Sequence, residues 1–388
     1  MRPRSGCPRR VIEAVDTRAR GLRGRRNEAV EAASVVRRLD WILLAATGAL
    51  VAYGLWAIAG ITRHDVTGNA NYYVVRQGVY ASLGLLALVV AVFVDPEYYR
   101  RYRKQIYVGT LGLMVIVLLA GAVTRGSKRW LDLGFFKFQP SEFGKLLLVL
   151  FLAGMLADRA KRIGDSKTVL TAIGFAAGPI FLVFVQPDLG TAMVYTAALA
   201  GVLFLAGTRW THLAILGGAT LLAALLVLWI LPAAGHPVLK SYQQQRVVGF
   251  MHRNDDPRGA TYNVTQSINA VGAGGEHATD FVFASIAEQR GFVGVSILLL
   301  LYLLVIWRAL KVMAGARDAF SAIAAGGIVV ALLFQVFINV GMTVGIAPIT
   351  GIPLPFVSVG GSAMIANLLA IGVLEAIYVR GTGRRRRY

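Results

Sequence analysis

Cysteine and acidic residues are scarce in this chain of 388 residues. Cys7 is the single cysteine, so a disulfide within the chain and a cysteine metal cluster are both excluded. Charged residues make up 15% of the sequence, against roughly 25% in soluble domains. The 20 acidic residues are outnumbered by 40 basic ones. This composition is not that of an ordinary soluble protein.

Long apolar runs occupy most of the remaining sequence. Hydrophobic residues make up 56% of the chain and the mean hydropathy is +0.61. The runs are about 17 to 25 residues long, the length that a helix needs to cross roughly 30 Å of hydrocarbon. We therefore predict an all-α, polytopic integral membrane protein of about ten transmembrane helices. They are expected near residues 40–60, 75–94, 106–124, 140–157, 168–186, 190–207, 211–232, 281–308, 320–343 and 357–378.

The arginines of the two tails indicate topology rather than nucleic-acid binding, because no aromatic residues are interleaved with them. Cations fill both ends of the chain and the loops after the second, fourth and eighth spans. We therefore predict a protein of the cytoplasmic (inner) membrane. By the positive-inside rule, both of its termini are predicted to lie in the cytoplasm. Residues 1–38 are expected to form a disordered basic tail without a cleavable signal peptide, 39–379 the membrane domain with a long extracytoplasmic loop at 232–280, and 380–388 a second basic tail.

A charged outer segment precedes the predicted helix at 140–157. It carries Arg129 and Lys137, and the helix itself then carries Glu142 and Lys145. Glu142 and Lys145 are three residues apart, so they share one helix face. Two interpretations stay open for this pair: a structural ion pair, or ionisable groups that line a substrate path in the membrane.

Two aspartates lie at predicted outer helix ends. Asp188 follows Gln186-Pro187 and is predicted to cap the next helix. Asp280 precedes the helix at 281–308, with His277 before it and Glu288 after it. Asp280 either caps its helix or acts as a general base, since proton abstraction needs a carboxylate within hydrogen-bond reach. The Gly- and Pro-rich segment 335–362 is expected to wall the same cleft, because irregular backbone at this depth requires protein or water around it.

Several blocks together resemble the shape, elongation, division and sporulation (SEDS) family, which includes RodA, FtsW and SpoVE. They are RWLDLGFFKFQPSEFGK, FVQPDLGTA, QQQRVVGF, DPRGATYNVTQS, TDFVFASIAE and INVGMTVGIAPITGIPLPFVSVGGS, in this order. The resemblance covers the chain from about Arg37 to the end of the last predicted helix. The chain departs from the family in a shorter outer loop before Glu276.

The resemblance implies the SEDS fold and a peptidoglycan glycosyltransferase that polymerises lipid II on the outer face of the cytoplasmic membrane. Asp280 matches the family's proposed catalytic base, and Glu142 and Lys145 match its glutamate and lysine in the fourth helix. The diphosphate of the substrate would be bound by Arg129, Lys137, Lys145 and Arg246, with Glu142, His277 and Glu288 in the same site. No dedicated metal cluster is visible, although Mg²⁺ or Mn²⁺ can bridge diphosphates.

The resemblance also implies partners and leaves alternatives. A class B penicillin-binding protein transpeptidase is expected to pack its transmembrane helix against the helices at 281–308 and 320–343, within an elongation or division complex. An elongation role of the RodA type is favoured over division. The alternatives to an enzyme are a lipid II flippase, and a non-catalytic scaffold for the penicillin-binding protein.

Overall fold

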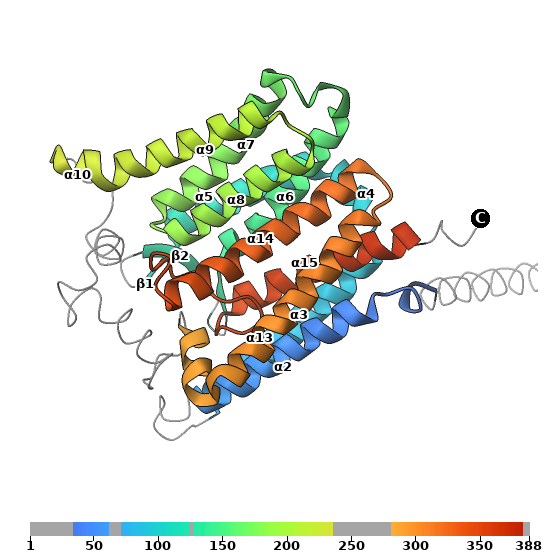
Figure 1. The fold of residues 1–388 in the computed structure, drawn as a ribbon, viewed down its shortest axis with the longest axis vertical. Helices are drawn as coiled ribbons and strands as arrows, with labels where there is room; N and C mark the ends of the chain where they lie inside the picture. Colours follow the sequence, from blue (N-terminus) through green and yellow to red (C-terminus); the bar gives the residue numbers. More distant parts are fainter. Residues whose placement is uncertain are drawn as a thin grey trace, which may run out of the picture.

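The computed structural model describes residues 34–61, 71–124, 127–132, 134, 136–235 and 281–382. In these ranges long helices lie side by side, and a small β-sheet covers one end of them (Figure 1). The helices are α2 (Trp41–Ile61), α3 (Tyr72–Phe93), α4 (Pro96–Arg101), α5 (Arg103–Ala120), α6 (Pro140–Asp158), η1 (Ala160–Arg162), α7 (Ser166–Val185), α8 (Leu189–Leu205), α9 (Trp210–Leu225), η2 (Leu226–Ile230), α10 (Leu231–Ala233), α13 (Val282–Ala314), α14 (Ala319–Thr343) and α15 (Gly361–Thr382).

The membrane-spanning helices follow the predicted apolar runs. Nine helices within the described ranges are long and apolar enough to cross a membrane, and α8, with 17 residues, is the shorter tenth. The prediction of an all-α polytopic protein with about ten such helices is therefore confirmed. The predicted end of the membrane domain, residue 379, falls within α15, which continues to Thr382.

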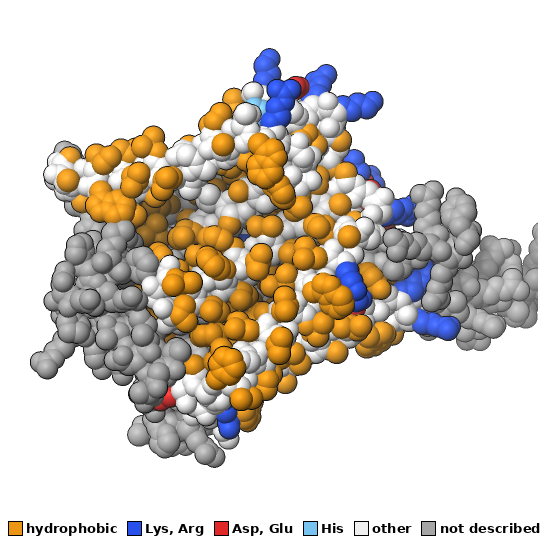
Figure 2. Space-filling model, viewed as in Figure 1, with side chains coloured by type: hydrophobic (Ala, Val, Ile, Leu, Met, Phe, Trp, Pro, Cys, Tyr) orange, Lys and Arg blue, Asp and Glu red, His pale blue; other side chains and the backbone are white. Residues whose placement is uncertain are grey.

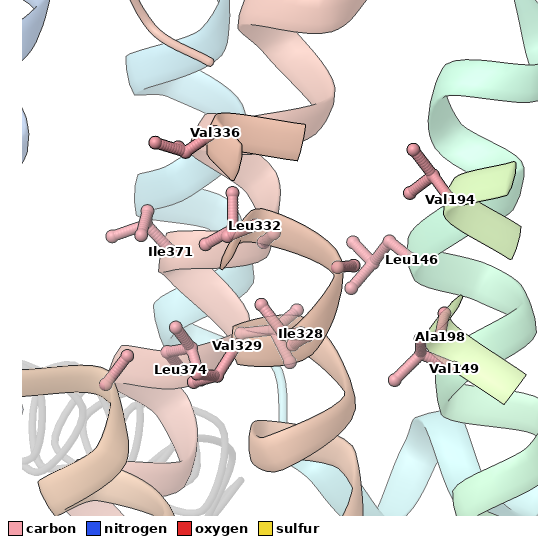
Figure 3. Close-up of a cluster of buried hydrophobic side chains, with 14 of the residues drawn as sticks. Leu146, Val149, Val194, Ala198, Ile328, Val329, Leu332, Val336, Ile371 and Leu374 are labelled. Carbon is pink, nitrogen blue, oxygen red and sulfur yellow. The ribbon is translucent and has the colours of Figure 1, made fainter. Parts of the chain in front are cut away.

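Helices α6, α14 and α15 form the centre of the bundle, where most of their residues are buried. Figure 3 shows α14 between two layers of side chains. Leu146 of α6 and Val194 of α8 lie on one side of it, and Ile371 of α15 lies on the other. Between α3 and α15, a Cβ at Gly372 would lie 2.5 Å from the carbonyl oxygen of Leu88. Small residues of this kind allow membrane helices to approach closely.

Helix α9 is attached very differently. None of its residues is buried, and its contacts with the other described helices are few: it packs against α8, and His212 lies 3.2 Å from the hydroxyl of Ser166 at the start of α7. It diverges from the bundle at the end that carries the sheet (Figure 1). Its position therefore depends on few contacts within the protein.

Helix α7 contains Pro179, which has no N–H to bond the carbonyl of Phe175 one turn earlier. The hydroxyl of Tyr107 on α5 donates to that carbonyl over 2.7 Å. A neighbouring helix thus satisfies the backbone group that the proline leaves open, as membrane helices require.

The sheet has three short antiparallel strands in the order β1 (Ala122–Thr124), β2 (Ser127–Asp132) and β3 (Lys137–Phe138). It is joined to α15 through Ser362, whose Oγ accepts from the N–H of Gln139 (2.9 Å) and donates to the carbonyl of Lys137 (3.0 Å). The sequence analysis did not predict these strands. Runs of two to six residues are too short to show a strand periodicity.

Charged side chains join the helices at the opposite end of the bundle. Arg308 of α13 donates to Asp40 before α2 (Nη2 to Oδ2, 2.6 Å), and the N–H of Asp40 donates to Glu375 of α15 (2.9 Å). Figure 2 shows that most visible Lys and Arg side chains gather at this end, whereas the middle of the molecule presents apolar side chains. This distribution is typical of a protein whose middle lies in lipid.

Candidate functional site

Strand β2 carries Arg129 to the turn between α7 and α8. Its Nη2 donates to the carbonyl oxygen of Pro187 over 2.7 Å, and its Nη1 lies 3.5 Å from Oδ2 of Asp188. The side chain is 19% exposed. The guanidinium is therefore held in a fixed orientation by groups of another element.

Asp188 has two structural tasks at this turn. Its Oδ1 accepts from the N–H of Thr191 (3.1 Å), so it caps α8 as predicted from the sequence. Its Oδ2 accepts from Nε2 of Gln139 (3.2 Å) and faces Arg129. The buried carboxylate thereby joins the start of α8 to the segment before α6.

An apolar cavity of about 350 Å³ lies beside Arg129. Helices α7 and α8 and the loop after α14 form one part of its wall, and α9 with η2 forms the other. Arg129 is the one charged side chain among the lining residues that the structure describes. The others are Phe184, Pro187, Leu189, Met193, Thr220, Ala223, Ala224, Val227, Leu228, Pro348, Ile349 and Thr350. The segment 335–362 contributes Pro348, Ile349 and Thr350 to this wall, whereas the predicted cleft with Asp280 involves a residue outside the described ranges.

The start of α13 reaches the wall of this cavity. Phe281 is 7% exposed and belongs to a buried cluster with Ala284, Met342 and Ile349. Ile349 also lines the cavity. The predicted base Asp280 immediately precedes Phe281 and lies outside the described residues, as do Arg246 and His277.

Glu142 and Lys145 form a buried ion pair. Nζ of Lys145 donates to Glu142 (2.8 Å) and to Oε1 of Gln335 on α14 (2.8 Å), and the two charged residues are 3% and 5% exposed. Gln335 also donates from Nε2 to the carbonyl of Ala331 (3.1 Å). The structure thus contains the ion pair that the sequence analysis gave as one interpretation. It does not place either residue in the lining of the cavity beside Arg129.

The two other described candidates lie apart from this lining. The side chain of Lys137 is exposed on β3, and Glu288 is half-buried in the first part of α13. Glu288 precedes Gly291, whose φ of 61° breaks the helix into two parts. Of the predicted binding residues that are described, Arg129 alone lines the cavity.

Gln335 is a site residue that the sequence analysis missed. It is one of two buried amides one turn apart on α14, and the other, Asn339, donates to the carbonyl of Ile352 (2.8 Å). Polar residues inside an apolar span are unusual enough to mark a structural or functional contact. Their spacing was the signal that would have identified them.

The apolar cavity and Arg129 together suit an amphiphilic ligand. The lining accepts an apolar chain, and the fork of Arg129 can bind a phosphate or carboxylate in addition to its present partners. No group of three His, Cys, Asp or Glu side chains that could hold a metal ion occurs within the described part of the chain.

Comparisons with known proteins agree on one family. The family model described as cell cycle protein, for FtsW, RodA and SpoVE, matches residues 37–382. Peptidoglycan glycosyltransferase MrdB of Escherichia coli K12 is 34% identical over 357 residues, which cover 87% of this chain and 94% of that protein. Stage V sporulation protein E of Bacillus subtilis strain 168 is 32% identical over 353 residues, which cover 86% of this chain and 93% of that protein.

A solved structure shows the same fold. A chain from a study of the structural coordination of polymerization and crosslinking by a peptidoglycan synthase complex superposes with a TM-score of 0.78 at 30% identity. The match covers 89% of this chain and 99% of that one.

Proposed function

Because the chain belongs to the cell cycle protein family of FtsW, RodA and SpoVE, we propose that it is a peptidoglycan glycosyltransferase that polymerises lipid II into glycan strands. The observation that carries this proposal is the apolar cavity beside Arg129. Lipid II joins a polyprenyl chain to a sugar through a diphosphate. A cavity with an apolar wall and one oriented guanidinium matches both parts of such a substrate.

Arg129 is assigned to the diphosphate. Its partners Pro187 and Asp188 fix the plane of the guanidinium before substrate arrives, so little ordering is needed on binding. A charge that is 19% exposed also interacts more strongly than one in bulk water. Lys137 and Arg246 are proposed to add positive charge from the outer segments as the leaving diphosphate becomes more anionic.

Asp280 is assigned as the general base. It takes the proton from the 4-hydroxyl of the acceptor N-acetylglucosamine, and the oxygen attacks the anomeric carbon of the donor. The bond from that carbon to the diphosphate breaks, and the configuration at the carbon inverts. The buried cluster that Phe281 shares with Ile349 supports this assignment, because Ile349 also lines the cavity. His277 and Glu288 are proposed as neighbours that orient the acceptor.

Glu142 and Lys145 are assigned a positioning role rather than direct contact with the diphosphate. The Lys145 ammonium donates to oxygens of Glu142 and Gln335, so it already has protein partners. Through Gln335 it joins α6 to α14. These two helices carry, respectively, the segment next to Asp188 and the loop that walls the cavity. A divalent cation, Mg²⁺ or Mn²⁺, is proposed to arrive with the diphosphate. The described residues offer no ligand set for it, so no step is assigned to it.

The protein is a multi-pass membrane protein, and we place it in the cytoplasmic membrane with both termini in the cytoplasm. The gathering of cations at the end opposite the sheet supports this orientation (Figure 2). A class B penicillin-binding protein is the proposed partner, in an elongation complex rather than a division complex. Exposed apolar side chains on α13 and α14 offer it a surface, among them Phe292 (87% exposed), Leu303 (62%) and Phe337 (57%).

The test is polymerisation by the purified full chain, reconstituted with its penicillin-binding protein and supplied with lipid II. Glycan strands should form, and Asp280→Ala should abolish them at unchanged expression. Lys161→Gln, a change at the opposite end of the bundle, is the matched control and should leave the rate unchanged. Full polymerisation by Asp280→Ala would remove the assigned base. Movement of lipid II across liposomes without polymer would favour a flippase, and partner binding without polymer would favour a scaffold.

A further inference from the structure

A second cavity lies at the other end of α6, between α5, α6 and α7. Its volume is about 500 Å³, within the range of sites for small ligands. Asp158, the last residue of α6, contributes to its lining. The 19 residues of α6 span about 28 Å, so the end of this cavity at Asp158 lies a full membrane helix away from the sheet. The proposed polymerisation has no use for it.

The rim of this cavity carries an excess of positive charge. Its charged lining residues are Arg103, Lys104, Arg159 and Asp158. The single carboxylate is shared, because Asp158 pairs with Arg103 (2.5 Å) and with Arg100 outside the lining (2.7 Å). Within the described ranges, Lys104 and Arg159 have no ion-pair partner at all. Two cations at the rim are therefore available to an anion.

Arg103 is held in place at this rim. Its Nη1 donates to the carbonyl of Arg100 (3.2 Å), and its Nη2 contacts Asp158. Gly154 on α6 makes room for its stem, since a Cβ there would lie 3.0 Å from Cδ of Arg103. The pair of Arg103 and Asp158 therefore keeps a fixed arrangement at the rim.

The floor of the cavity is aromatic. The rings of Tyr107 and Phe151 stack with centroids 4.4 Å apart, and Phe175 meets Phe151 edge-on at 5.0 Å. The Tyr107 hydroxyl already donates to the carbonyl of Phe175, so it presents no free donor to a ligand. Val108 (66% exposed) and Phe175 (39% exposed) extend the apolar surface towards the lipid. The floor suits a hydrocarbon chain.

The positive-inside rule explains why cations are found at this end, but not why they surround an aromatic hollow. A basic pocket between membrane helices is the arrangement that binds anionic lipid headgroups. We propose that this cavity is a binding site for an anionic phospholipid of the adjacent leaflet. Lys104 and Arg159 bind its phosphate and net negative headgroup, and Tyr107, Phe151 and Phe175 receive one acyl chain.

The proposal is tested by fluorescence anisotropy with the full chain in detergent. The probe is phosphatidylglycerol labelled on one acyl chain, and the competitors are unlabelled phosphatidylglycerol, phosphatidylcholine with the same chains, and inorganic phosphate. Phosphatidylglycerol should compete at least about tenfold better than phosphatidylcholine. The double variant Lys104→Gln/Arg159→Gln should bind phosphatidylglycerol about thirtyfold more weakly, as expected for the loss of two surface cations. Its affinity for phosphatidylcholine should fall much less, because the choline cation offsets the charge of that lipid's phosphate.

The matched control is Lys161→Gln/Arg162→Gln, which removes the same charge from exposed positions at the same end but outside the cavity lining. It should weaken binding by less than about threefold, because exposed charges at a distance are screened by salt. Phe175→Ala should weaken both lipids. Equal losses of phosphatidylglycerol affinity in the two double variants would indicate a general electrostatic attraction to this end of the protein and would overturn the proposed site. Unchanged lipid binding in Phe175→Ala would overturn the acyl-chain contact, and competition by inorganic phosphate as strong as by lipid would overturn the assignment to a phospholipid.

Discussion

The buried contact between α6 and α14 gives the sharpest prediction. Lys145→Met removes the ammonium that Glu142 and Gln335 both contact at 2.8 Å. The carboxylate of Glu142, 3% exposed, is then left in the protein interior without its cation. Breaking a buried pair in this way costs about 3–5 kcal/mol. Since about 1 kcal/mol moves Tm by roughly 2–4 °C in domains of moderate size, the variant should melt about 10 °C lower.

The double variant Glu142→Gln/Lys145→Met separates the two interpretations of this pair. It removes both charges and keeps a side chain of similar volume at each position, so most of the lost stability should return. If the pair only joins α6 to α14, polymerisation of lipid II should return with stability. The assay is thermal unfolding of the detergent-solubilised full chain, read alongside polymer formation by the same samples.

The reasoning would be refuted by a double variant that is as unstable as Lys145→Met alone. A double variant with normal Tm and no polymer would give a different answer, because it would return Lys145 to direct binding of the diphosphate. Glu97→Gln is a suitable control for the charge change, because its exposed carboxylate lies 3.5 Å from Arg100 and such surface pairs contribute little.

Three other predictions concern the cavity, α7 and the metal. Arg129→Lys keeps the charge but loses the fork that contacts Pro187 and Asp188, so the rate of polymerisation should fall by about tenfold or more in the lipid II assay, and a rate equal to wild type would contradict the assigned role. Tyr107→Phe leaves the Phe175 carbonyl unpaired and should lower the free energy of unfolding by about 1–2 kcal/mol, measured by denaturant unfolding. Adding Pro179→Ala to that variant should restore the free energy of unfolding, because the new N–H can bond the same carbonyl. EDTA should slow polymerisation without changing Tm, and Mg²⁺ or Mn²⁺ should restore the rate; insensitivity to EDTA would exclude the proposed cation.

The sequence predicted the membrane helices well because hydropathy over 17 to 25 residues is a strong signal. It also identified the cap formed by Asp188, since an aspartate just before an apolar run is a local pattern. Both features depend on residues that are close together in the chain. The positions of the loops relative to one another depend on tertiary contacts that local patterns do not contain.

The candidate site shows where this limit falls. The sequence singled out Arg129 as a diphosphate-binding residue, but not its contact with Pro187, which joins residues 58 positions apart. Gln335 was missed because its partner Lys145 lies 190 positions away. The contribution of α9 to the cavity wall was equally hidden, since an apolar helix without a polar face gives no indication of which side meets protein. Asp280, the residue on which the mechanism depends, stays a prediction.

The bond from Tyr107 to the Phe175 carbonyl has an evolutionary consequence. A proline at position 179 is less destabilising while a donor on α5 reaches the open carbonyl, so the two positions are expected to change together among descendants of this chain. Loss of the tyrosine first would pass through a weakened intermediate, whereas loss of the proline first would not. Lineages should therefore reach a chain without either residue by replacing Pro179 before Tyr107.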